Sequence, residues 1–192
     1  MPLEPTADAP TWRLRVWTRF LAPAQDVWAY KTSLVGLRTE LSPLRLVIAD
    51  PQGMERALAQ GRPGHFQARL VPPGVAWPID LVEVEPGRLF ADHSDNALFS
   101  RFEHRHLVEP TPDGARYVDD LLLSPRGPLR GAILSLTVRL FQHRHRRAAR
   151  DLPHDPRVCG ITVLREQLAH ERPGAAPPEE PAAMPPGDLP QP

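Results

Sequence analysis

Two histidines with one residue between them, His104 and His106, are the side chains of this sequence best suited to chemistry. Large and polar residues alternate around them, which predicts a strand on which both imidazoles point to the same face. Imidazole can transfer protons near neutral pH, contact a polar ligand or bind a metal ion. A metal needs a third ligand, for which Asp92 and His93 are the nearest candidates. The pair can equally be plain core structure, and we expect no metal site.

Two neighbouring aspartates, Asp119 and Asp120, lie on the next predicted strand. Adjacent strand residues point to opposite faces, so one can pair across strands with His104, His106 or Arg116 while the other is solvated. A buried His–Asp pair can act as an acid/base unit, which makes His104 and Asp119 the candidate catalytic residues. A purely structural pairing explains the same residues, so both alternatives stay open.

Aromatic side chains recur on several successive predicted strands. Such residues suit a flat, apolar ligand, although ordinary core packing accounts for part of them. Arg69 alternates with two polar residues and can either grip a ligand carboxylate or face water. Beside His104 and His106, the candidate cavity residues are Trp77, Phe90, Phe102, Tyr117 and Arg69.

The elements that position these residues follow from periodicity and turn residues. Alternation predicts a first strand over residues 12–20, followed by two short helices near 22–30 and over 34–41. A long helix with apolar residues at helical spacing is predicted near the end, over 129–150. Short runs between turn residues predict an antiparallel meander of strands over 44–48, 65–71, 75–84, 88–93, 99–109 and 115–123. This order predicts an α+β fold with helices on one face of an antiparallel sheet.

The middle of the sequence resembles the START-like SRPBCC superfamily, which includes polyketide cyclase/dehydrase and Bet v 1-like proteins. The resemblance spans about residues 11–152. It rests on Trp77-x3-Leu81-x3-Glu85-Pro86-x3-Phe90-x-Asp92, Phe102-Glu-His104-Arg-His106-Leu-Val108, Val27-Trp28, Leu37-x3-Leu41-Ser-Pro43, Tyr117-Val-Asp119 and Leu140-Phe-Gln-His-Arg144. The sequence departs from the family at Phe102, where tryptophan is usual, and at Ala97-Leu98, which replace a Gly-Pro turn.

The resemblance implies the helix-grip fold, in which a curved antiparallel sheet wraps around a long C-terminal helix over a deep, mainly apolar cavity. Members of the superfamily bind or transfer lipids, hormones, quinones and polyketides, and some are cyclases or hydrolases. We therefore expect a cavity between sheet and helix, with a hydrophobic small molecule as the partner.

A group of arginines lies near the end of the long predicted helix. Cations there stabilise the negative end of the helix dipole. A sharper interpretation is contact with an anionic membrane near the cavity mouth. The group consists of Arg139, Arg144, Arg146, Arg147 and Arg150. The whole chain has 23 basic and 23 acidic residues and no nucleic-acid reader motif, so we expect no nucleic-acid partner.

Proline is unusually frequent, with 25 among 192 residues, and its distribution divides the chain. We expect a loose arm over 1–10, a START-like domain over 11–152, a C-terminal extension over 153–170 and a disordered tail over 171–192. The single cysteine, Cys159, excludes an intramolecular disulfide framework. The N-terminus does not resemble a signal peptide and no apolar run reaches the about 20 residues of a membrane span, so we expect a cytoplasmic protein.

The expected function is non-enzymatic binding of a lipid, quinone or polyketide-like molecule between the sheet and the long helix. Two alternatives stay open. One is a cyclase/dehydrase-type enzyme that moves a proton on a polyketide-like substrate through His104 or Asp119. The other is a lipid or quinone carrier that docks on membranes. The sequence carries no nucleotide-binding, serine-hydrolase or zinc-protease motif, and we expect no cofactor.

Overall fold

The structure is a computed structural model that describes residues 10–154 and 161–168. The helices are α1 (Ala24–Thr32), α2 (Leu34–Leu41), α3 (Pro51–Gln60) and α4 (Arg130–Asp151). The strands are β1 (Trp12–Phe20), β2 (Arg45–Ile48), β3 (Gly64–Phe66), β4 (Ala68–Val71), β5 (Val75–Ala76), β6 (Ile79–Glu85), β7 (Leu89–Ser94), β8 (Phe99–Thr111), β9 (Gly114–Pro125) and β10 (Ile161–Gln167).

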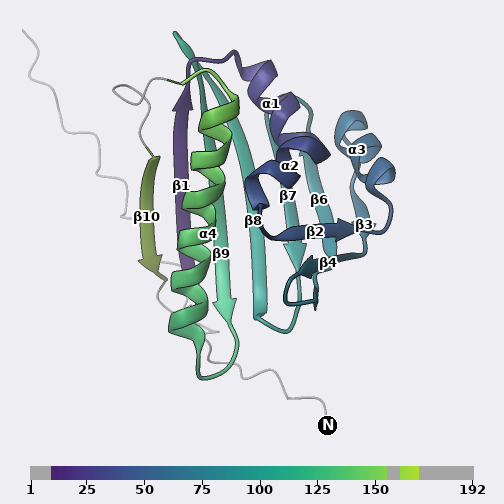
Figure 1. The fold of residues 1–192 in the computed structure, drawn as a ribbon, viewed down its shortest axis with the longest axis vertical. Coiled ribbons are helices and arrows are strands. Elements are labelled where there is room, and N and C mark those ends of the chain that lie inside the picture. The colour runs from purple at the N-terminus through teal and green to yellow at the C-terminus, as the bar shows by residue number, and fades with distance from the viewer. Residues whose placement is uncertain (1–9, 155–160, 169–192) are drawn as a thin grey trace, which may run out of the picture.

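A curved antiparallel sheet lies against α4, as Figure 1 shows. Its strand order is β10-β1-β9-β8-β7-β6-β3, and a small second sheet has the order β2-β4-β5. The helices α1 and α2 follow β1 directly and lie beside α4 over the same side of the sheet (Figure 1). This arrangement confirms the predicted α+β class with a long C-terminal helix.

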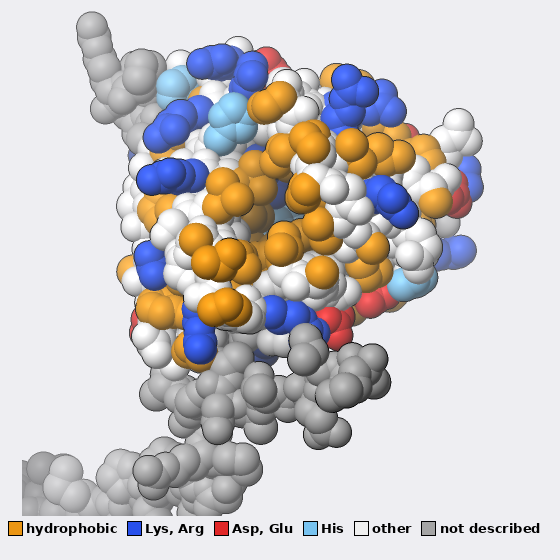
Figure 2. Space-filling model, turned by 60° about the horizontal axis from the view of Figure 1, so that its bottom comes forward, with side chains coloured by type: hydrophobic (Ala, Val, Ile, Leu, Met, Phe, Trp, Pro, Cys, Tyr) orange, Lys and Arg blue, Asp and Glu red, His pale blue; other side chains and the backbone are white. Residues whose placement is uncertain are grey.

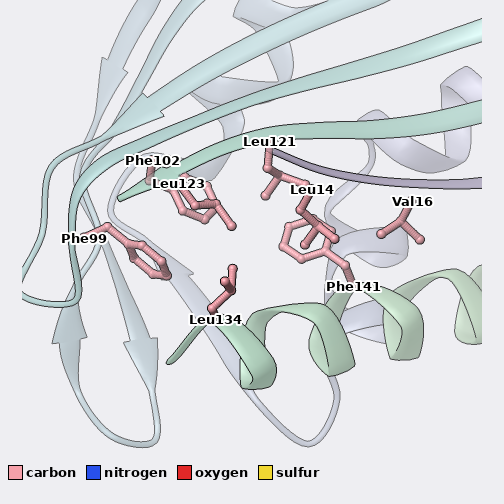
Figure 3. Close-up of a cluster of buried hydrophobic side chains, with 8 residues drawn as sticks. All are labelled: Leu14, Val16, Phe99, Phe102, Leu121, Leu123, Leu134 and Phe141. Carbon is pink, nitrogen blue, oxygen red and sulfur yellow. The ribbon is translucent and has the colours of Figure 1, made fainter. Parts of the chain in front are cut away.

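The buried stripe of α4 changes character along the helix. Its first half buries Leu134 and Phe141, which pack with residues of β1, β8 and β9 into the apolar cluster of Figure 3. Its second half buries Arg144 and His145, at the same helical spacing. The second half of the helix therefore brings charged and titratable groups into the interior of the protein.

The long β8–β9 hairpin depends on Gly114, which directly follows the turn. Its backbone has a φ of 155°, and a Cβ at this position would lie 2.1 Å from the carbonyl oxygen of Phe20. The backbone at Phe20, the end of β1, thus passes too close to Gly114 for any side chain at that position.

Replacing Gly114 with alanine is expected to lower the free energy of unfolding by about 2 kcal/mol or more, because backbone must move to admit the methyl group. The matched control is Gly131→Ala in α4, where no atom lies within 4 Å of the added Cβ. That change should stabilise the protein by about 0.5–1 kcal/mol through helix propensity. Urea unfolding of both variants measures the difference, and equal stabilities would contradict it.

The helix α3 lies between the predicted strands over 44–48 and 65–71, where the sequence predicts only a connection. Pro51 occupies the first turn of the helix, where its missing N–H costs nothing. The side chain of Asp50 accepts a hydrogen bond from the Gly53 N–H at 2.8 Å, and Gly61 ends the helix with a positive φ. Both caps are ordinary helix boundary signals.

Two predicted strands are divided between the sheets. The run 65–71 becomes β3 and β4, and the run 75–84 becomes β5 and β6. Each change of sheet interrupts the strand. Residues of the C-terminal extension form β10, which pairs with β1 over seven residues and was not predicted as a strand.

Three expectations fall on residues outside the described ranges: most of the loose arm over 1–10, the thiol of Cys159 and the tail over 171–192. Within the described part of the chain, no helix combines the length and apolar character needed to cross a membrane.

Candidate functional site

A cavity of about 150 Å³ lies between the sheet, α4 and the smaller elements around them. Its walls are apolar, with leucines from α2, β2, β4 and α4 and aromatic rings from β7 and β8. In Figure 2, hydrophobic side chains surround a hollow in the surface of the protein. The cavity therefore has the composition of a site for an apolar molecule.

Aromatic rings form the sheet side of the cavity. Trp77 packs edge-on against Phe102, with ring centroids 5.0 Å apart, and against Phe99 at 6.0 Å. Phe90 stacks on His106, with centroids 3.8 Å apart. These contacts fix the position of the rings, so the wall is preformed.

Three of the polar residues that line the cavity come from neighbouring positions on two adjacent strands. Asp92 on β7 lies opposite His104 on β8, and Phe90 lies opposite His106. Asp92, His104 and His106 are all buried and all line the cavity. Strand pairing therefore places one carboxylate and two imidazoles side by side.

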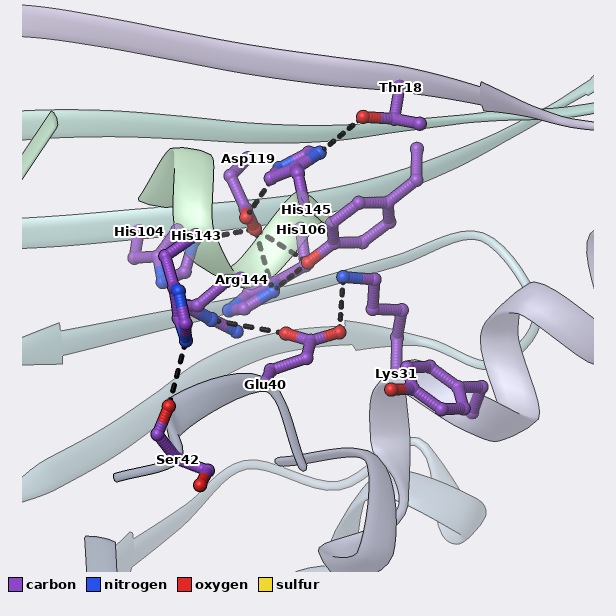
Figure 4. Close-up of polar contacts among 12 residues, drawn as sticks. Thr18, Lys31, Glu40, Ser42, His104, His106, Asp119, His143, Arg144 and His145 are labelled. Atoms are coloured by element: carbon purple, nitrogen blue, oxygen red, sulfur yellow. Dashed lines mark hydrogen bonds and ion pairs between the residues drawn. The ribbon is translucent and has the colours of Figure 1, made fainter. Parts of the chain in front are cut away.

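Asp119 on β9 lies behind this pair and accepts hydrogen bonds from three directions, as Figure 4 shows. The His104 Nε2–H donates to Oδ1 at 2.9 Å and the Tyr117 hydroxyl donates to Oδ1 at 2.5 Å. On the other side, the His145 Nε2–H donates to Oδ2 at 3.0 Å. The side chain of Asp119 is fully buried, so these groups replace the water that it has lost.

The pKa values of this cluster follow from burial and charge. Burial acts to raise the pKa of Asp119, but the positive charge of Arg144 and the contact with His104 outweigh it and hold the pKa well below its usual range. Burial lowers the pKa of His104 to about 4, assisted by the neighbouring His106. Burial also lowers the pKa of His145, and it raises the pKa of Tyr117 together with the charge of Asp119. Asp119 is therefore ionised, and His104 and His145 are neutral, at pH 7.

A second buried group lies beside the first and joins three helices. Glu40 of α2 accepts from Lys31 of α1 at 2.5 Å and from the Nε–H of Arg144 of α4 at 3.1 Å (Figure 4). The Lys31 ammonium also lies 3.9 Å from the centre of the Tyr117 ring. Burial lowers the pKa of Lys31, whereas the charges of Asp119 and Glu40 outweigh burial and raise the pKa of Arg144. Lys31 and Arg144 both line the cavity.

The predicted cavity residues fall into two sets. Trp77, Phe90, Phe102, His104 and His106 line the cavity. Tyr117 does not line it, because its ring is fully buried behind His106 in a separate apolar cluster. Arg69 does not line it either, because its side chain lies on the exposed face of β4.

As the alternation predicts, Asp119 and Asp120 point to opposite faces of the sheet. The outward-facing Asp120, however, pairs with arginines as well as meeting solvent. Asp119 points inward to His104, while Asp120 points outward and pairs with Arg13 at 2.7 Å and Arg15 at 3.3 Å. Arg116 pairs instead with Glu109. His93, the other candidate for a third metal ligand, is exposed, because its side chain points to the opposite face of β7 from that of Asp92.

The group of arginines on α4 is not one surface patch. Arg139, Arg146 and Arg150 are exposed and Arg147 is half-buried, but Arg144 is buried against Glu40. Including Arg144 in a membrane-binding patch is therefore wrong, since its charge is already used inside the protein. Membrane contact at the other four arginines stays a prediction.

The sequence interpretation missed Lys31, Glu40, Arg144 and His145 as interior residues. One usable signal was that Lys31 is the only lysine among 23 basic residues. Another was that Arg144 falls on the same helical stripe as Phe141 and Ala148, which are buried.

Solved structures with a similar fold include START-like proteins. A START superfamily protein from Mycobacterium smegmatis matches with a TM-score of 0.53 at 12% identity, covering 73% of this chain and 97% of that one. An aromatase/cyclase, ZhuI, from Streptomyces sp. R1128 gives 0.52 at 13% identity, covering 73% and 95%. A protein from Chromobacterium violaceum gives 0.56 at 14% identity, covering 74% and 99%. These similarities confirm the predicted SRPBCC/START-like fold.

The chain belongs to the family described as a domain of unknown function, DUF8410, whose model matches residues 18–152. No curated protein is significantly similar to the sequence.

Proposed function

We propose that this protein binds a small hydrophobic molecule, such as a lipid, a quinone or a polyketide-like compound, in the cavity between the sheet and α4. The observation that carries this proposal is the contrast within the cavity: apolar walls, with the buried polar groups of Asp92, His104 and His106 gathered at one place. Such a site recognises a molecule with an apolar body and a few polar atoms.

The cavity volume restricts what part of the molecule lies inside. A volume of about 150 Å³ is that of an engineered cavity that holds one benzene ring. We infer that a ring or a similar head group occupies the cavity beside His104 and His106. The remainder of a longer molecule extends through the hydrophobic mouth seen in Figure 2.

A cavity-blocking variant tests this proposal. Leu46 is half-buried on β2 and lines the cavity, so Leu46→Trp should obstruct the mouth without overpacking the core. We expect wild-type protein to bind the uncharged fluorophore N-phenyl-1-naphthylamine saturably, and Leu46→Trp to bind it about 10-fold more weakly, which is about 1.4 kcal/mol. Fluorescence titration measures both.

The matched control is Val47→Trp, because Val47 is the next residue, is 55% exposed and does not line the cavity. Its affinity should stay within about twofold of wild type, since no cavity contact changes. Equal weakening by both substitutions, or no saturable binding, would contradict the proposal. Native mass spectrometry of the purified protein then identifies any molecule that co-purifies.

The second candidate is a cyclase/dehydrase-type enzyme, and the His104–Asp119 contact favours it. Because the Nε2–H of His104 donates to Asp119, its Nδ1 is the atom left to accept a proton from a bound substrate. One of the similar structures is an aromatase/cyclase by its name. A mass change in a bound polyketide-like compound, seen in the same mass spectra, would distinguish turnover from binding alone.

A further inference from the structure

Three metal-ligating atoms converge where the polar groups meet the cavity. One oxygen of Asp92, Oδ1, lies 3.3 Å from Nε2 of His106 and 3.8 Å from Nδ1 of His104. The three donor atoms all lie within 4.8 Å of one another. Ligands at about 2.1 Å from a metal lie roughly 3.0–3.4 Å apart in tetrahedral or octahedral geometry. The 3.3 Å separation already lies in that range, and the 3.8 Å separation needs a contraction of about 0.4 Å.

Hydrogen bonds hold both rings so that these particular nitrogens face Asp92. The Nε2–H of His104 donates to Asp119, and the Nδ1–H of His106 donates to the Tyr117 hydroxyl at 2.6 Å. Nδ1 of His104 and Nε2 of His106 are therefore the ring atoms left to bind a metal ion. Together with the Asp92 oxygen, they face the same small volume.

The charges of the buried residues point the same way. Among the described residues, the buried acids are Glu40, Asp92 and Asp119, and the buried bases are Lys31 and Arg144. Glu40 pairs with both bases, while Asp92 has only the histidines as hydrogen-bonding or ionic partners. These buried acids thus outnumber the two bases by one, and Asp92 and Asp119 both contact histidines instead of those bases.

We propose that Asp92, His104 and His106 bind a divalent first-row transition metal ion at the cavity wall. Two imidazoles and one carboxylate are a ligand set that such ions accept, and they leave coordination positions open toward the cavity. Asp119 and Tyr117 fix the ring orientations from behind, as outer-shell acceptors do in metalloproteins. The bound ion would polarise a carbonyl or hydroxyl oxygen of a molecule in the cavity. This proposal does not depend on which organic molecule is bound.

Metal titration without any organic ligand tests the site. Chelator-treated protein is titrated with Co(II), followed by visible absorption, and with Zn(II), followed by calorimetry. We expect one equivalent to bind with micromolar or tighter affinity, and Zn(II) to raise the melting temperature. Asp92→Asn keeps a hydrogen-bond acceptor but removes the charge, and should weaken binding by about 10-fold or more.

The control is His93→Gln, because His93 adjoins Asp92 but is exposed on β7. Its metal affinity should equal that of wild type. If Asp92→Asn does not fold, as judged by circular dichroism, His106→Gln takes its place. No binding by wild type, or equal binding by wild type and the ligand variants, overturns the proposal. A failure to bind metal would not change the fluorophore titrations of wild type, Leu46→Trp and Val47→Trp, so the two proposals fail separately.

Discussion

Replacing Asp119 with asparagine is expected to lower the free energy of unfolding by about 3–5 kcal/mol, the range for breaking a fully buried charge network. Asparagine offers one acceptor oxygen where Asp119 uses two, and its NH₂ would face an imidazole N–H. The change also removes a charge that stabilises the buried Arg144 guanidinium. Urea unfolding of wild type and variant gives the difference directly.

Asp120→Asn is the matched control for this experiment, since it makes the same chemical change one residue along β9. Asp120 faces outward to Arg13 and Arg15, whose side chains are 41% and 38% exposed. The arginine ends of these pairs are exposed, while the Asp120 side chain is 13% exposed and accepts two hydrogen bonds from Arg13. This variant should therefore lose about 1 kcal/mol, well below the loss expected for Asp119→Asn. If the two substitutions destabilise the protein equally, Asp119 is not the centre of the buried network.

The second large effect is acid destabilisation of the metal-free protein. His104 has a folded-state pKa of about 4, below its ordinary value of 6.5, and the pKa of His145 is lowered in the same direction. The unfolded chain therefore binds protons that the folded chain rejects. Stability should fall as the pH drops from about 6.5 toward 4, by up to about 1.4 kcal/mol per pH unit from His104, with a further loss of the same sign from His145.

Below about pH 4 the loss continues for a different reason. The pKa of Asp119 and that of Asp92 are both held below the usual range, so their contribution disappears as these carboxylates become protonated. Urea unfolding between pH 7.5 and pH 4, with chelator present, measures the slope. His93→Gln should leave the slope unchanged, because His93 is exposed. A flat profile between pH 7 and 5 would mean that the folded and unfolded chains take up the same number of protons, and that folding does not lower the pKa values of the two buried histidines.

The sheet side of the site could be predicted from the sequence because a strand has a fixed period of two. That period places His104 and His106 on one face and separates Asp119 from Asp120, and the structure has both arrangements. Antiparallel pairing then brings neighbouring strands into contact, which is why Asp92 could be named as a possible partner of the histidines.

The helix side could not be predicted in the same way. Lys31, Glu40 and Arg144 come from three helices, and no local periodicity determines how α1, α2 and α4 pack on one another. A charged residue on a helix is ordinarily exposed, so residue type gives no reason to place any of these three in the interior. The failure to predict α3 has a local cause instead. The sequence contains both helix caps, Asp50 and Gly61, but Pro51 is typical of a break between strands as well as of a first helical turn.

The pairing of β10 with β1 has a consequence for any shortened form of the chain. The family model covers residues 18–152, which leaves out β10 and most of β1. In a fragment cut at those limits, β9 would lose most of its pairing with β1 and become an edge strand. Its unpaired N–H and C=O groups could then pair with strands of other chains. A fragment that ends directly after α4 would lack β10. Residues 12–18 of β1, including Trp12 and Trp17, would then form an unpaired sheet edge. A fragment meant to stay monomeric must therefore begin before Trp12 and extend past Gln167, which is a wider span than family resemblance alone would suggest.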